Sequence, residues 1–159
     1  MISGTISPEN YLSAQHLHRR KTVQRNIAIA ASMIAAGIAF LFFSQLIIGV
    51  GLIGGGIGCG IGELILAKVV LPRKARRTFS QQKDLAEVFT YSWNSEFIVA
   101  RSAIGESKRP WKNYSKYAEN AHIFLLYHAD NLFEMFPKTW FQSQEQLDDF
   151  RAKASLARS

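Results

Sequence analysis

The chain has 159 residues, a formal net charge of +7 and one cysteine. A single cysteine excludes an intramolecular disulfide framework, which fits a reducing compartment. No nucleic-acid recognition motif accompanies the charge, and roughly half of the basic residues flank one long apolar block. We therefore expect no nucleic-acid partner, and a lipid bilayer as the first partner of the chain.

Residues 1–26 precede the apolar block and are predicted to form a juxtamembrane segment. Pro8 and Glu9 are typical of a helix start, and Tyr11 and Leu12 suit a short amphipathic helix that lies in the membrane interface. For the first seven residues the alternative interpretation is a disordered tail.

Residues 27–71 form the apolar block, in which only Glu63 and Lys68 carry formal charge. One membrane span needs about 20 residues, and a straight helix over this block would be on the order of 65 Å long. We therefore predict a two-helix transmembrane hairpin. Its turn is expected at residues 44–51, where the turn-permissive residues cluster: Ser44, Gln45, Gly49 and Gly51.

Basic residues flank both ends of this hairpin, and none lies at its predicted turn. The positive-inside rule then places both termini in the cytoplasm. The flanking residues are Arg19, Arg20, Lys21 and Arg25 on one side, and Lys68, Arg73, Lys74, Arg76 and Arg77 on the other.

The second predicted span is rich in glycine, with GxxxG spacings at 51/55, 54/58, 56/60 and 58/62. Small residues at this spacing allow helix backbones to approach closely in lipid. The glycines are expected to pack against the alanines of the first span, and the alternative is a homo-oligomer through the second span.

Glu63 is the one acidic residue of the apolar block, and an ionisable group at membrane depth is a candidate functional site. The alternative interpretation places Glu63 at the cytoplasmic boundary of the span, where its charge costs little.

Residues 72–87 are predicted to continue the second helix as a linker to a cytoplasmic domain at residues 88–159. Alternating side chains predict strands at 88–93 and 96–101, and a further stretch is expected at 108–111. A short apolar run at 122–127, a turn and a further strand at 132–136 predict a second hairpin. Ser143 and Gln146 form a capping box before a closing amphipathic helix that carries Leu147, Phe150 and Ala154. The fold class is therefore an α+β membrane protein, with four or five antiparallel strands in one curved sheet capped by a C-terminal helix.

Several motifs of this domain resemble, in their order and spacing, the C-terminal domain of the YcxB-like family of bacterial membrane proteins. The resemblance implies a pleckstrin-homology-like domain, a bacterial inner membrane and no catalytic residues. Its aromatic residues are expected to form the core, except Trp140, which is expected at the surface near lipid. The motifs are residues 89–93, 111–114, 124–127, 136–138 and 147–151, with Tyr117, Glu119 and Phe141 between them.

The basic residues Lys108, Arg109, Lys112 and Lys116 are candidate contacts for a protein partner or for anionic lipid headgroups, and a solvated face is the alternative. The four histidines and Cys59 do not make a metal set, and no Walker A or nucleophile-elbow pattern is present. We therefore expect no cofactor, no metal and no enzymatic activity. The expected function is a membrane-anchored binding module, and the alternative is a membrane-resident immunity protein that neutralises a toxin.

Overall fold

The computed structural model describes residues 1–81, 87–103 and 105–157. It divides into two compact units, one formed by Met1–Leu17 with Ala75–Ser159 and the other by His18–Lys74. The part of the predicted linker at residues 82–86 lies outside the described residues. The two units are taken in turn.

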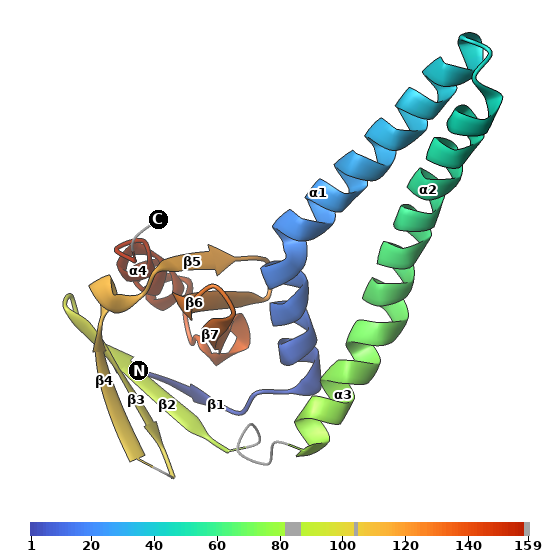
Figure 1. The fold of residues 1–159 in the computed structure, drawn as a ribbon. Helices are drawn as coiled ribbons and strands as arrows, with labels where there is room; N and C mark the ends of the chain where they lie inside the picture. The colour runs from blue at the N-terminus through green and yellow to red at the C-terminus, as the bar shows by residue number, and fades with distance from the viewer. Residues whose placement is uncertain (82–86, 104, 158–159) are drawn as a thin grey trace. The chain divides into compact units, whose positions relative to one another are not determined.

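The unit at residues 18–74 is a helical hairpin (Figure 1). It contains most of α1 (Pro8–Phe42) and all of α2 (Leu46–Ile65), so the helix start predicted at Pro8 is confirmed. The connection comprises only residues 43–45, with Ser44 in the left-handed region at φ 60°. The predicted turn at 44–51 is therefore too long, because Gly49 and Gly51 continue the helix rather than interrupt it.

Glycines bring the two helix backbones together, although not in the GxxxG pairs singled out in the sequence. A Cβ added at Gly56 would lie 2.7 Å from the carbonyl oxygen of Ala30, and one at Gly37 would lie 2.7 Å from that of Gly49. Gly55 also faces α1, because its added Cβ would lie 2.8 Å from the Met33 side chain. Each GxxxG pair has at least one member with no described atom within 4 Å of an added Cβ, and these members are Gly51, Gly54, Gly58, Gly60 and Gly62. One glycine face therefore packs within the hairpin, and the other meets no described part of the chain.

Both helices are long and apolar enough to cross a membrane. Only 11% and 6% of their most apolar windows are buried, unlike a core helix of a soluble protein. A π-helical turn at Leu66–Val70 separates α2 from α3 (Leu71–Gln81). This turn lies directly before Pro72, which lacks the N–H that would bond to the preceding turn, so the wider turn accommodates the proline without ending the helix.

The other unit contains two antiparallel sheets and a closing helix (Figure 1). The first sheet has the order β1-β2-β3-β4, and the second has the order β5-β6-β7. The strands are β1 (Ile2–Gly4), β2 (Phe89–Trp93), β3 (Phe97–Ser102), β4 (Gly105–Pro110), β5 (Lys116–Glu119), β6 (Ile123–Ala129) and β7 (Leu132–Pro137). The closing helix is α4 (Gln144–Ala154).

The predicted strands are confirmed, but the prediction that they form a single curved sheet is wrong. Strand β4 ends at Pro110, and a 3-10 turn at Trp111–Asn113 redirects the chain into β5, which pairs with β6 instead. Proline cannot extend the hydrogen-bond ladder, so the first sheet stops there and a second begins.

The first seven residues are not a disordered tail. Strand β1 pairs with β2, with Ile2 opposite Tyr91, and Ile2 is only 2% exposed. Trp140 lies against Gly4 and stacks on Tyr91 at 6.2 Å, with 9% of its surface exposed. The surface position expected for Trp140 is therefore wrong, because the sheet gains a strand from before the hairpin, and that strand covers the indole.

Aromatic side chains fill the core of this unit. Phe150 of α4 is fully buried and contacts five aromatic rings at centroid distances of 5.0 to 5.7 Å: Trp93, Trp111, Phe124, Phe136 and Phe141. The predicted cap of α4 is confirmed, because the Ser143 hydroxyl accepts a hydrogen bond from the backbone N–H of Gln146. The first turns of α1 cover the second sheet, where Ala14 and Leu17 pack against Ile123, Leu125 and Tyr127.

Candidate functional site

The four basic residues singled out in the sequence do not point in one direction. Lys108, Lys112 and Lys116 are exposed, whereas Arg109 is partly buried. Lys108 and Arg109 are neighbours on β4, and successive side chains of a strand point to opposite faces of the sheet. The three lysines therefore offer the most exposed charge of the four residues, whereas the Arg109 side chain is 37% exposed.

Two of these lysines already have partners. The Lys108 Nζ lies 3.5 Å from the centre of the Phe97 ring, and the Lys116 Nζ lies 3.0 Å from the Asp130 carboxylate. Asp130 is 94% exposed, so this ion pair is strongly screened by water. Lys116 therefore keeps much of its capacity to interact with an external anion.

Arg109 enters a polar network between the two sheets. Its Nη1 contacts His128 Nδ1, and the Nε2 of the same ring lies 2.9 Å from Glu134 Oε1. The Tyr114 hydroxyl donates to Glu134 Oε2 at 3.1 Å. These residues come from β4, the segment after the 3-10 turn, β6 and β7, so Glu134 is the point where the sheets are joined by polar contacts.

The network affects the tyrosines around it. Burial, followed by the negative charge of Glu134, raises the pKa of Tyr114 well above its ordinary value. The same two causes, in the same order, raise the pKa of Tyr91. Both phenols are therefore neutral hydrogen-bond donors at physiological pH, and neither is suited to act as a base.

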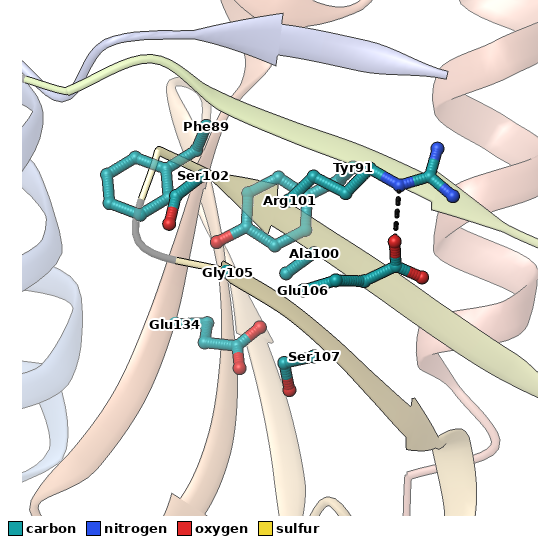
Figure 2. A pocket seen from close by; sticks show the side chains of 9 residues that line it. All are labelled: Phe89, Tyr91, Ala100, Arg101, Ser102, Gly105, Glu106, Ser107 and Glu134. Carbon is teal, nitrogen blue, oxygen red and sulfur yellow. Dashed lines mark hydrogen bonds and ion pairs between the residues drawn. The ribbon is translucent and has the colours of Figure 1, made fainter.

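A groove of about 470 Å³ lies beside this network (Figure 2). The rings of Phe89 and Tyr91 form one wall, and Glu134 of β7 lies on the opposite side (Figure 2). We call it the Glu134 groove. Its full lining is Phe89, Tyr91, Ala100, Arg101, Ser102, Gly105, Glu106, Ser107 and Glu134.

Small side chains leave the groove unfilled. Ala100 and Ser102 of β3 are paired with Ser107 and Gly105 of β4, so all four positions lie on the same face of the first sheet. Strands β4 and β7 are both at the edge of their sheets, and no described strand pairs with either edge. The volume lies in the usual range for ligand sites, about 300–1,000 Å³.

Glu63, the acidic residue of the apolar block, is paired within the hairpin unit. Its Oε1 lies 2.9 Å from Arg19 Nη2, and its Oε2 accepts a hydrogen bond from the Asn26 side chain at 3.1 Å. The side chain of Arg19 is 19% exposed and that of Glu63 is 13% exposed. This arrangement holds α1 and α2 together, and it supplies the counter-charge that a carboxylate in an apolar segment requires.

Glu134 and His128 were not among the site residues predicted from the sequence. The network joins residues from separate strands, so no local spacing indicates it. The alternation of side chains along β4, which places Arg109 on the opposite face from Lys108, was the one signal in the sequence that could have indicated this network.

The region that carries these side chains is also the part of the chain with a recognised relationship. Residues 93–154 match the YcxB-like protein family. The YcxB-like match begins at the end of β2 and ends with α4, so it includes the network and most of the groove. Comparisons with curated proteins and with solved structures gave no significant match.

The YcxB-like region offers chemistry for binding. Among the described residues, no group of three or more His, Cys, Asp and Glu side chains is placed to hold a metal ion. The groove is lined by aromatic rings, hydroxyl groups and the carboxylates of Glu106 and Glu134. These groups are suited to hold a ligand by packing, hydrogen bonds and charge.

Proposed function

We propose that the chain is a bacterial inner-membrane protein, with its two apolar helices as an anchor and a cytoplasmic, pleckstrin-homology-like domain as a non-enzymatic binding module. Two antiparallel sheets closed by a C-terminal helix support this assignment of the domain. Its partners are anionic lipid headgroups or a protein at the inner leaflet.

The pairing of β1 with β2 is the observation that carries this proposal. Strand β1 precedes the apolar hairpin and β2 follows it, yet Ile2, Ser3 and Gly4 are in register with Tyr91, Thr90 and Phe89. A sheet cannot form across a bilayer, so both ends of a membrane-spanning hairpin must lie on the same side as the domain. The basic residues at both ends of the hairpin favour the cytoplasmic side.

Sidedness is tested with two single-cysteine variants in a Cys59→Ser background. Ser44→Cys lies in the hairpin connection, and Ser155→Cys follows α4; both side chains are exposed. A membrane-impermeant thiol reagent should label Ser44→Cys in right-side-out vesicles and Ser155→Cys in inverted vesicles. Labelling of both positions in the same vesicles, or extraction of the chain by carbonate without detergent, would refute the proposed anchoring.

Lipid recognition is assigned to the exposed lysines of the domain. Lys108, Lys112 and Lys116 carry positive charge at the surface, while Arg109 is held by His128. Each lysine close to an anionic membrane surface contributes about 1 kcal/mol of attraction. An anionic bilayer should therefore stabilise the domain in the full chain.

This interaction is measured with the full chain in nanodiscs of phosphatidylcholine, with or without phosphatidylglycerol. Thermal unfolding of the domain should shift upward with the anionic lipid. The triple variant Lys108→Glu, Lys112→Glu and Lys116→Glu should lose that shift, and Lys153→Glu on α4 serves as the control. If anionic lipid still raises the unfolding temperature of the triple variant by the same amount, the lysines only interact with water and do not recognise the lipid.

A further inference from the structure

We propose that the Glu134 groove binds an extended peptide segment that lies along β4 and places a lysine side chain against Phe89 and Tyr91, with its ammonium group at Glu134. This inference rests on the proposed function as a binding module and names the partner class. It assigns the groove to a protein, whereas the exposed lysines are assigned to lipid.

The chemistry of the groove selects a cationic side chain. An ammonium group is attracted both to aromatic faces and to carboxylates, and the methylene chain of lysine packs on rings. The rings of Phe89 and Tyr91 lie with their centroids 6.4 Å apart and line the groove together. Glu134 lines the opposite side of the same groove, so a lysine packed on the rings directs its ammonium group toward the carboxylate (Figure 2).

Glu134 retains capacity for a further donor. A carboxylate accepts about four hydrogen bonds, and those from His128 and Tyr114 occupy two of these positions. Arg109 forms an ion pair with Glu134 Oε1 at 3.8 Å but donates no hydrogen bond to it, because its Nη1 is closer to His128. The Glu134 side chain is 25% exposed, so an incoming group can reach it.

The charges around the groove agree with this choice. Its lining contains two carboxylates, Glu106 and Glu134, and one cation, Arg101. Arg101 is paired with Glu106 at 2.8 Å at the exposed rim, so the two charges offset each other. Glu134 also raises the pKa of the buried Tyr91, which shows that its negative charge acts on the groove.

Strand β4 favours a peptide over a lipid headgroup as the source of the ammonium. It is the edge of the first sheet, and its residues from Gly105 to Lys108 are exposed. An unpaired strand edge presents backbone N–H and C=O groups that an added strand can bond. Because alternate side chains of an added strand point to one face, every second residue of the peptide faces the groove.

Binding is tested with the full chain in detergent and immobilised pools of seven-residue peptides. The central residue is lysine, norleucine or glutamate, and the other positions are randomised. Norleucine keeps the hydrocarbon chain of lysine but lacks the ammonium group. The lysine pool should capture about tenfold more protein than the norleucine pool, as expected for one charge-assisted hydrogen bond.

Three variants locate the binding. Glu134→Gln should abolish the preference for lysine over norleucine, and Ser107→Leu, which fills the groove without a change of charge, should reduce capture of both pools. Glu145→Gln on the exposed first turn of α4 should leave capture unchanged. Tryptophan fluorescence confirms that each variant is folded.

Equal capture of the lysine and norleucine pools, or an unchanged preference in a folded Glu134→Gln variant, would overturn the inference. Binding of the protein to phosphatidylethanolamine micelles but not to phosphatidylcholine micelles, with no peptide pool capturing it, would assign the groove to a lipid amine and also overturn the inference. Because the assay needs neither a bilayer nor anionic lipid, its failure is separate from failure of the proposed anchoring or lipid binding.

Discussion

Replacement of Gly4 by alanine tests whether β1 is an integral part of the domain. A Cβ at this position would lie 2.5 Å from Trp140 Cδ1 and Cε2, and closer still to Nε1. Ordinary contact between these atoms is at about 3.5 Å, so the indole or the strand must move by about 1 Å. Trp140 is buried and stacks on Tyr91, which leaves it little freedom to move.

Overpacking of this kind costs about 1–3 kcal/mol of unfolding free energy. A domain of this size loses about 4–8 °C in Tm per kcal/mol, so the expected decrease is roughly 5–20 °C. The chain has three tryptophans, at positions 93, 111 and 140, and all of them lie in the unit that contains the sheets. Tryptophan fluorescence during heating therefore reports on this unit without a contribution from the hairpin.

The matched control is Gly105→Ala at the start of β4, where a new Cβ meets no described atom within 4 Å. This variant should unfold at the wild-type temperature or slightly above, because alanine restricts the unfolded chain. If Gly4→Ala is as stable as Gly105→Ala to within about 0.5 kcal/mol, the packing of β1 under Trp140 is refuted.

Three further predictions concern other parts of the chain. Gly56→Ala should destabilise the helical hairpin by about 1–3 kcal/mol in a mixed-micelle titration with SDS, because its Cβ would meet the Ala30 carbonyl oxygen at 2.7 Å, while Gly60→Ala should have little effect. Arg151, and then Lys138, lower the pKa of Glu119, so its stabilising contribution is complete above about pH 4.3 and is lost as the pH falls through the folded-state pKa. The difference in unfolding free energy between wild type and Glu119→Gln should therefore shrink in acid, and a difference that grows there would contradict this. Phe150→Ala should cost about 3–5 kcal/mol of unfolding free energy in chemical denaturation, because the ring is fully buried among other aromatic residues.

Local patterns predicted those elements whose signals lie within a few residues. The Pro8 helix start, the Ser143 cap and the strands β2, β3, β6 and β7, predicted from alternating side chains or short apolar runs, belong to this group. Strands β1 and β5 were missed because they have three and four residues, too few for a periodic signal. Both depend on partners supplied by other parts of the chain, β1 on Tyr91 and β5 on β6.

Of the candidate site, only a group of basic residues could be predicted from the sequence. The sequence indicated Lys108, Arg109, Lys112 and Lys116, but the alternation of β4 turns Arg109 into the polar network. Glu134 contacts residues that lie 6 and 20 positions away in the chain. Long-range strand pairing creates that neighbourhood, so a local search has no signal for it.

The discontinuous first sheet has a consequence for biosynthesis. Ile2 is synthesised before its partner Tyr91, which is added 89 positions later. At about 5–20 residues per second, Ile2 waits roughly 4–18 seconds before its partner exists. Throughout this interval the nascent chain carries β1 as an unpaired strand, so the domain completes its first sheet only after the whole hairpin has been synthesised.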